Sequence, residues 1–194
     1  MSLTALGEAH GTDKLFHGYL PLYEKHLPQD VTSLLEIGVF GGKSLRMWRD
    51  RFPGARIYGL DVDPGCQKHA TAGIDITIGS QDDPVVLEAL AQKAGGFDVV
   101  IDDGSHVNEL TIASFEALWP HTRRLYVIED LECSYVNLTP HVAGWPGMGY
   151  NRPDLDYRNH RSDMDRFFTR LIRDVDAEKM SLHFYPNIVF MEKL

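Results

Sequence analysis

FDVVIDDGSH, residues 97–106, joins a short apolar run to two aspartates, a glycine, a serine and a histidine. The apolar run has the length and the β-branched content of a buried strand. In an open parallel sheet, ligands bind outside the carboxyl ends of the strands. Ionisable residues that begin where such a strand stops therefore predict an α/β fold with a site at the carboxyl edge of its sheet.

On both sides of this stretch, short apolar runs alternate with segments of helical period. This alternation predicts parallel strands joined by crossover helices. The predicted strands are residues 33–39, 56–62, 74–78, 97–102 and 124–129, and the predicted helices are residues 43–52, 84–93 and 107–119.

The last third of the chain has a different pattern. Apolar residues from Met164 to Val175 follow helical spacing, and Ser162 is placed to act as the N-cap of that helix. Residues 180–185 and 188–194 are strand-like and are joined too tightly for a crossover helix. One of these two strands is therefore expected to run antiparallel to its neighbour, as in a final hairpin.

The composition indicates a soluble globular chain whose partners are small molecules. The 194 residues are 43% hydrophobic and fit a single domain over residues 1–194. A formal net charge of -9 argues against nucleic acid or an anionic membrane surface as a partner. The sequence has no membrane-spanning run and no signal peptide, so we expect a cytoplasmic location. Residues 131–157 show no sustained period and are expected to form a substrate lid.

A glycine turn follows the first predicted strand. Glu36 and Gly38 precede a second glycine pair, Gly41-Gly42, and Asp61 ends the next strand about twenty residues on. Glycines that allow close backbone approach, followed by an acid that can bind ribose hydroxyls, indicate an adenosine-type ligand. A dinucleotide and S-adenosylmethionine both contain adenosine. The spacing differs from G-x-G-x-x-G, and an acid at Glu36 suits an ammonium group, so S-adenosylmethionine is favoured.

Four carboxylates end two predicted strands, with Asp102-Asp103 on one and Glu129-Asp130 on the next. If the strands are neighbours, these like charges need a compensating cation, and an all-oxygen set suits Mg²⁺. The alternative is that some of them, Asp102 above all, only cap the following helices. A metal would make an acceptor hydroxyl easier to deprotonate, and His106 is placed to take its proton.

Three motifs carry a resemblance to a known family: I-D-D-G-S-H, S-F-E-A-L-W-P and V-I-E-D-L-x-x-S-Y. Together they resemble the metal-dependent sugar O-methyltransferases of antibiotic biosynthesis, within the class I S-adenosylmethionine-dependent superfamily. The resemblance implies a Rossmann-like, mainly parallel seven-stranded sheet with an antiparallel final hairpin and helices on both faces. It also implies Mg²⁺ bound by Asp103, Glu129 and Asp130, and His106 as general base.

The resemblance further implies which residues contact the methyl donor. Residues 11–19, within an N-terminal helical cap of residues 1–30, would close over the donor; the alternative is an amphipathic helix that merely covers the sheet. Glu36 and Gly38 would border the methionine part, Asp61 the ribose, and the segment after the third strand the adenine. The full set of expected donor contacts is Thr12, Lys14, His17, Tyr19, Glu36, Gly38, Ser44, Asp61, Ser80, Gln81 and Asp102.

The leading hypothesis is therefore an enzyme. We expect an S-adenosylmethionine-dependent, Mg²⁺-assisted O-methyltransferase that acts on a sugar hydroxyl of a nucleotide sugar or a glycosylated natural product, and that forms a homo-oligomer. A cephalosporin-hydroxylase-like iron oxygenase is a second hypothesis, although only one histidine lies beside the acids in the sequence. A non-catalytic module that binds S-adenosylmethionine is a third.

Overall fold

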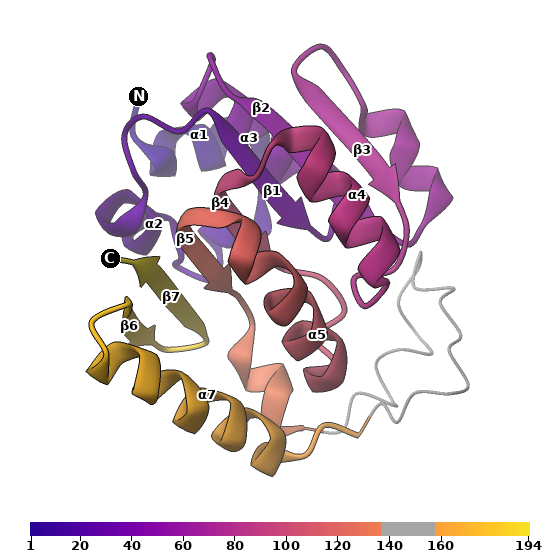
Figure 1. Cartoon of the computed structure of the whole chain (residues 1–194). Coiled ribbons are helices and arrows are strands. Elements are labelled where there is room, and N and C mark those ends of the chain that lie inside the picture. Colours follow the sequence, from indigo (N-terminus) through magenta and orange to yellow (C-terminus); the bar gives the residue numbers. More distant parts are fainter. Residues whose placement is uncertain (137–157) are drawn as a thin grey trace.

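The computed structural model describes residues 1–136 and 158–194, which form a seven-stranded mixed sheet with helices on both faces (Figure 1). The strand order is β3-β2-β1-β4-β5-β7-β6, and β7 runs antiparallel to both β5 and β6. The predicted fold class, including the final hairpin, is confirmed. The strands are β1 (Ser33–Ile37), β2 (Arg56–Asp61), β3 (Ile74–Ile78), β4 (Phe97–Asp102), β5 (Thr122–Ile128), β6 (Met180–Tyr185) and β7 (Ile188–Lys193).

The helices form two layers around this sheet. One face packs against the first three α-helices and the other against the last three, as Figure 1 shows. The α-helices are α1 (Leu3–His10), α2 (Leu20–His26), α3 (Lys43–Arg51), α4 (Pro84–Ala94), α5 (Asn108–Leu118) and α7 (Arg161–Asp176). Short 3₁₀ helices are η1 (Asp13–Leu15), η2 (Pro64–His69), η3 (Trp119–His121) and η4 (Leu131–Tyr135).

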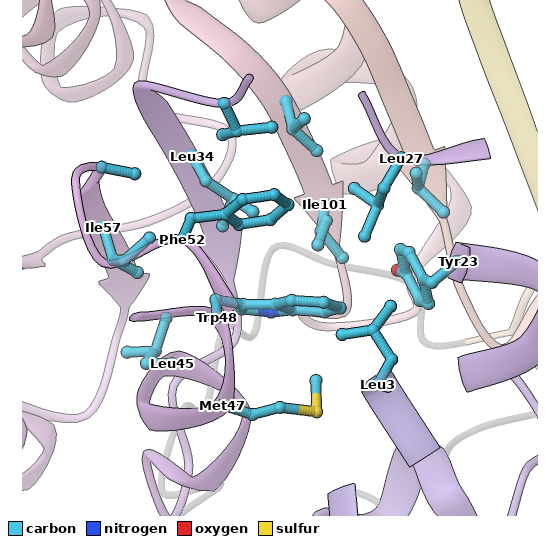
Figure 2. Close-up of a cluster of buried hydrophobic side chains, with 14 of the residues drawn as sticks. Leu3, Tyr23, Leu27, Leu34, Leu45, Met47, Trp48, Phe52, Ile57 and Ile101 are labelled. Atoms are coloured by element: carbon cyan, nitrogen blue, oxygen red, sulfur yellow. The ribbon is translucent and has the colours of Figure 1, made fainter. Parts of the chain in front are cut away.

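Each face of the sheet buries its own apolar core, because successive side chains of a strand point to opposite faces. On the first face, Trp48 of α3 is fully buried, with its ring 5.1 Å from that of Tyr23 (Figure 2). On the second face, Phe115 of α5 lies 5.0 Å from both Tyr126 and Phe167. Truncating Trp48 to alanine would cost about 3–5 kcal/mol of stability, the usual penalty for a large buried aromatic residue.

The helix ends follow local chemistry in most places. The Asp83 side chain accepts hydrogen bonds from the backbone of Val85 and Val86, with proline at the first position of α4. The prediction of Ser162 as the N-cap of α7 was wrong. The helix starts at Arg161 after His160, so Ser162 lies inside its first turn.

The first thirty residues are only partly helical. Residues 11–19 form a turn around η1, so the alternative of an amphipathic helix there was wrong. The reason is that Gly11 and Gly18 both adopt positive φ, at 65° and 72°, which a helix does not allow. The predicted lid at residues 131–157 begins with η4, and its residues 137–157 lie outside the described part of the chain. None of the described helices combines the length and apolarity needed to span a bilayer.

Candidate active site

A cavity of about 920 Å³ opens at the carboxyl ends of β1, β2, β4 and β5. Its walls come from the loops that follow these strands and from the turn around η1. The strands β4 and β5 are paired in parallel, so the two pairs of acids do meet at one edge, as predicted. A cavity of this size can hold a nucleoside-sized ligand together with part of a second molecule.

The glycine turn after β1 brings two loops into contact. Gly38 has a φ of 93°, and a Cβ at this position would lie 2.0 Å from the backbone oxygen of Asp103. Only glycine fits there without moving the Asp103 loop. The Asp61 carboxylate lines the cavity and accepts hydrogen bonds from the backbone of Val39, at 2.8 Å, and Phe40, at 3.1 Å. Asp61 therefore holds the glycine turn at the cavity wall.

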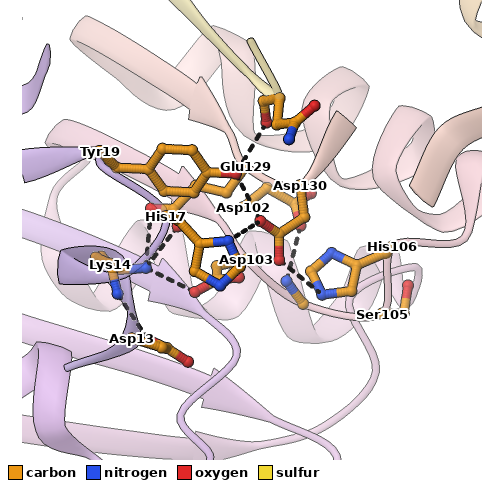
Figure 3. Close-up of polar contacts among 12 residues, drawn as sticks. Asp13, Lys14, His17, Tyr19, Asp102, Asp103, Ser105, His106, Glu129 and Asp130 are labelled. Carbon is orange, nitrogen blue, oxygen red and sulfur yellow. Dashed lines mark hydrogen bonds and ion pairs between the residues drawn. The ribbon is translucent and has the colours of Figure 1, made fainter. Parts of the chain in front are cut away.

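A lysine lies at the centre of the acid cluster (Figure 3). The Nζ atom of Lys14 lies 2.6 Å from Asp103, 2.8 Å from Glu129 and 3.0 Å from Glu36. The lysine side chain is 1% exposed, so these contacts exclude water. Burial opposes its charge, but the three carboxylates outweigh burial and raise the pKa of Lys14 well above its usual value.

The cluster carries more negative than positive charge. One ammonium group faces three carboxylates, and Asp130 adds a fourth acid nearby. Burial raises the pKa of Glu36 and of Glu129, since a buried carboxylate without full compensation favours its neutral form. The excess can be neutralised by protons or by a cation, and a divalent ion would satisfy it at neutral pH.

Three ionisable side chains of the cluster reach the cavity. Asp103, His106 and Asp130 each offer one ligand atom, and these atoms lie within 4.8 Å of one another. His106 Nε2 is 3.7 Å from Asp130 Oδ2, and the Tyr19 hydroxyl donates a hydrogen bond to Asp130 Oδ1 at 2.7 Å. Two carboxylates and an imidazole beside open volume can bind a divalent metal ion or move a proton.

Two of these residues have unusual backbone conformations. His106 has a φ of 57° and Asp130 a φ of 52°, in the left-handed region that few residues other than glycine adopt. The surrounding structure must hold them there, and residues held in this way are concentrated at functional sites. Because both conformations occur at the cavity, they support a functional role for this pair.

A buried asparagine pair holds the His106 loop. Asn159 Nδ2 donates hydrogen bonds to the backbone oxygens of His106, at 2.8 Å, and Cys133, at 2.7 Å. The Asn159 side-chain oxygen accepts the backbone N–H of Asn108 at 2.9 Å. The sequence analysis missed both asparagines, because their pairing joins segments 51 residues apart and no local pattern marks it.

Asp102 is buried below the cavity. It accepts hydrogen bonds from Ser114 Oγ at 2.5 Å and Gln81 Nε2 at 3.2 Å, and burial raises its pKa to about 6. The alternative that Asp102 caps the next helix was wrong, because the N-cap of α5 is Val107. Gln81 also accepts the backbone N–H of Ser105 at 2.7 Å, so it links Asp102 to the D-D-G-S-H loop.

The predicted site residues therefore divide into two groups. The cavity is lined by Thr12, His17, Gly38, Ser44, Asp61, Ser80, Gln81, Asp103, His106 and Asp130. Outside its lining are Lys14, Tyr19, Glu36, Asp102 and Glu129, which lie behind or beneath the wall. Wall residues that the sequence analysis did not identify include Phe16, Phe40, Lys43 and His69. Of these, Phe40 could most easily have been predicted, because it lies two residues after Gly38 in the glycine turn.

Glu129 differs most from its predicted role as a metal ligand. Both of its oxygens accept hydrogen bonds from Lys14, at 2.8 and 2.9 Å, and the Tyr23 hydroxyl donates a further hydrogen bond to it. Its side chain is 2% exposed. A ligand role for Glu129 would require Lys14 to leave it, so that role stays a prediction.

No family model matches the chain. Among characterised proteins, the chain is 37% identical over 204 residues to demethylmacrocin O-methyltransferase of Streptomyces fradiae, covering 91% of this chain and 49% of that protein. It is 35% identical over 211 residues to mycinamicin VI 2''-O-methyltransferase of Micromonospora griseorubida, covering 98% and 52%. A rhamnosyl tetracenomycin-C 2'-O-methyltransferase of Streptomyces olivaceus is 32% identical over 216 residues, covering 98% and 54%. The chain thus spans about half the length of these relatives.

Solved structures give the same relationship. The mycinamycin-pathway methyltransferase MycE, in complex with Mg, SAH and mycinamycin VI, superposes with a TM-score of 0.78 at 32% identity, covering all of this chain and 53% of that one. A caffeoyl-CoA O-methyltransferase-like protein from Staphylococcus aureus has a TM-score of 0.62 at 13% identity, covering 100% and 93%, and this likeness concerns the fold alone. The fold is that of the class I methyltransferases.

Proposed function

We propose that this chain, which is homologous to the sugar O-methyltransferases of antibiotic pathways, transfers a methyl group from S-adenosylmethionine to a sugar hydroxyl with the help of Mg²⁺. The observation that carries the proposal is the cavity at the carboxyl edge of the sheet. It places Asp61, a net-negative carboxylate cluster and His106 around one volume. The homology supplies the reaction class, and the geometry supplies a role for each side chain.

The donor fits the part of the cavity next to the glycine turn. Asp61 lies at the end of β2, where a carboxylate can accept the two hydroxyls of a ribose. Ser80 and Gln81 line the wall beyond β3 and would border the adenine, while Gly38 leaves room for backbone approach. Glu36 and Lys14 are buried behind this wall, so their effect on the donor would be electrostatic and positional.

The metal fits the open side of the acid cluster. Asp103 and Asp130 are oxygen donors at the cavity, and Mg²⁺ is usually bound through one or two carboxylates with the remaining positions filled by water or substrate. The uncompensated negative charge around Lys14 favours a divalent cation at this position. When bound there, Mg²⁺ would supply the Lewis acidity that lowers the pKa of an acceptor hydroxyl.

The chain's own residues would then move the proton. His106, held by Asn159 at the cavity wall, is positioned to accept the proton of the sugar hydroxyl. The acceptor oxygen forms its bond to the methyl carbon as the bond from sulfur to that carbon breaks, and S-adenosylhomocysteine leaves. The side chains of Phe16 and Phe40, which are exposed at the rim of the cavity, suit the apolar face of a sugar or its aglycone.

The wider biology follows from the same proposal. One relative is named for methylating a rhamnosyl tetracenomycin-C, which supports a glycoside as the acceptor. The net charge of -9 supports small-molecule partners, and we propose a cytoplasmic location as well. We also propose that residues 1–30 cap the donor site, that residues 131–157 form the substrate lid, and that the active unit is a homo-oligomer.

A calorimetric titration tests the donor site and the metal separately. Metal-free protein is titrated with S-adenosylhomocysteine, first alone and then with Mg²⁺, and Asp61→Asn serves as the donor-site variant. We expect binding by the unmodified chain and binding at least about tenfold weaker in Asp61→Asn, since a charge-assisted ribose contact contributes roughly 1.5–3 kcal/mol. Turnover is then measured on a panel of glycosides and nucleotide sugars with and without Mg²⁺.

The outcomes separate the three hypotheses. Donor binding with Mg²⁺-dependent turnover supports the methyltransferase. Donor binding without turnover on any acceptor, with or without metal, would favour a non-catalytic module. Failure to bind S-adenosylhomocysteine would contradict the proposal. The iron oxygenase gains no support here, because none of the potential metal-binding groups that the described residues form at this cavity combines two imidazoles with a carboxylate.

A further inference from the structure

A second group of metal-type ligands lies at the opposite edge of the sheet from β3. His26 ends α2, His183 is in β6 and Glu192 is in β7 (Figure 1). One ligand atom from each of the three lies within 4.8 Å of the others. None of them lines the active-site cavity, and none was identified from the sequence.

The strand register brings the two strand ligands onto one face. Ser181, His183 and Tyr185 alternate along β6 and so point to the same side of the sheet. Glu192 pairs with Ser181 across the two strands, one diagonal step from His183. His26 Nδ1 lies 2.8 Å from Glu192 Oε1, and His183 Nε2 lies 3.7 Å from Glu192 Oε2. Both imidazoles therefore face one carboxylate.

The surroundings of His26 resemble those of a metal-binding histidine. Its side chain is 4% exposed, and its ring stacks on Phe190 with the centroids 4.6 Å apart. Its second nitrogen, Nε2, is 2.8 Å from the hydroxyl of Tyr185. A histidine that binds a metal through one nitrogen almost always uses the other for such a hydrogen bond, which sets its orientation and tautomer. The Tyr185 hydroxyl can either donate or accept, so it satisfies both tautomers of His26.

The other two ligands are open to solvent. The side chains of His183 and Glu192 are 37% and 34% exposed, so an ion can enter without unfolding. Two imidazoles and one carboxylate, with a water in the fourth position, form a common Zn²⁺ ligand set. Ligand atoms about 2.0–2.1 Å from a tetrahedral Zn²⁺ lie about 3.4 Å apart. The two imidazoles lie 2.8 and 3.7 Å from the two different oxygens of Glu192, so a small movement of the carboxylate would bring one oxygen to both.

We propose that His26, His183 and Glu192 bind one Zn²⁺ ion, which joins α2 to the β6–β7 hairpin. When Nδ1 of His26 binds the metal ion, its proton moves to Nε2, which then donates a hydrogen bond to the Tyr185 hydroxyl. His26 and Glu192 are 166 residues apart in the sequence. The ion would fix the N-terminal helices to the last two strands, and it lies outside the cavity.

Cobalt and zinc titrations test this site directly. Chelator-treated protein is first saturated with Mg²⁺, the ion proposed for the oxygen-rich cluster, and is then titrated with Co²⁺ and Zn²⁺. We expect one equivalent to bind, with the visible absorption of tetrahedral Co²⁺ and a higher thermal midpoint with Zn²⁺. His183→Ala and Glu192→Gln should abolish both signals. Tyr185→Phe should weaken binding about 10–100-fold, as loss of an outer hydrogen-bond partner does.

Two controls locate the ion. His121→Ala removes a partly exposed histidine that pairs with Glu88, and it should leave Zn²⁺ binding unchanged. Asp130→Asn alters the active-site cluster, and it should also leave this Zn²⁺ site intact. Binding that survives His183→Ala and Glu192→Gln, or that is lost in Asp130→Asn, would overturn the proposal.

If a variant fails to fold, the site can still be tested on the unmodified chain. Nuclear magnetic resonance signals of the His26 and His183 rings should shift with one equivalent of Zn²⁺. Unshifted rings at saturation would overturn the proposal as well.

Discussion

Strand β4 carries an aspartate near each end, and the two ends are surrounded in opposite ways. Asp98, near the amino end, accepts hydrogen bonds from the Thr32 backbone and hydroxyl, both at 2.7 Å, and from Arg123 at 3.0 Å. Asp103, just past the carboxyl end, shares the single ammonium group of Lys14 with two other carboxylates. One acid is fully compensated, and the other belongs to a cluster with excess negative charge.

This difference shows how to tell a structural acid from a member of a functional cluster. Burial alone does not separate the two kinds, since Asp98 is 5% exposed and Glu129, a member of the cluster at the carboxyl end, is 3% exposed as a whole residue. The compensation of charge does. The hydrogen bonds and the guanidinium at Asp98 outweigh its burial and lower its pKa, whereas burial raises the pKa of Glu36 and Glu129. A cluster that stays under-compensated is suited to a cation that arrives with function.

Removing the lysine should have the largest effect. In Lys14→Met, the buried Glu36 and Glu129 and the partly exposed Asp103 lose their ammonium partner, and we expect the free energy of unfolding to fall by about 3–5 kcal/mol without metal. Added Mg²⁺ should recover part of this loss, because a divalent ion compensates the same charge. Urea unfolding with and without Mg²⁺ measures both effects.

Lys25→Met is the matched control for this change. Lys25 is a lysine of α2 whose Nζ contacts the Tyr185 hydroxyl at an exposed position. We expect a change within about 0.5 kcal/mol and no response to Mg²⁺. If Lys14→Met were equally neutral, the carboxyl end of β4 would not be the charged cluster described here.

Replacing His106, the proposed base, tests the carboxyl end of β4 through the rate of methyl transfer. In His106→Asn, a residue that tolerates positive φ replaces the imidazole, so the loop conformation is kept. We expect turnover to fall at least ~10²-fold, about 2.7 kcal/mol in activation free energy, with binding of S-adenosylhomocysteine unchanged. Single-turnover methyl transfer measures the chemical step. His121→Asn, on the surface, should turn over normally, and equal rates in both variants would exclude His106 as the base.

A substitution at the amino end of β4 should lower the stability of the protein and leave its rate of turnover unchanged. In Asp98→Asn, the carboxylate that binds Thr32 and Arg123 becomes neutral, and we expect a loss of about 2 kcal/mol in unfolding free energy. Turnover per folded molecule should stay unchanged, because Asp98 does not line the cavity. Chemical denaturation and an assay at low temperature measure the two quantities. A loss of activity without a loss of stability would mean that Asp98 has a functional role and not a structural one.

Most of the fold could be predicted because it depends on local patterns. The boundaries of β3, β4 and β6 match the predicted ranges, since each strand is a bounded apolar run. The N-cap of α7 was misplaced by two residues, because the N-cap residue, His160, makes no side-chain capping bond. The turn at residues 11–19 could not be told from a helix by pattern, because the positive φ of Gly11 and Gly18 is a backbone property that no periodicity reports.

For the site, the sequence predicts which residues gather at the edge of the sheet but not the contacts between them. The edge of the sheet that gathers Asp103, His106 and Asp130 follows from parallel topology. The contacts of Lys14 do not, since they join residues 89 and 115 positions apart through a turn with no periodic pattern. Long-range pairing also hid Asn159, because the residue that it holds, His106, lies 53 positions earlier in the sequence.

The smallest effect is a pH dependence that belongs to Asp98 alone. Its folded-state pKa lies below the value of about 3.9 in the unfolded chain, so its contribution to stability is present above pH 4. This contribution is lost as the pH falls through the depressed folded pKa. The stability difference between the unmodified chain and Asp98→Asn should therefore be constant from pH 7 to about 5 and shrink towards pH 3. Denaturation curves across this range measure it. A difference that persists undiminished at pH 3 would mean that the asparagine disturbs packing, and that charge compensation does not distinguish the two ends of β4.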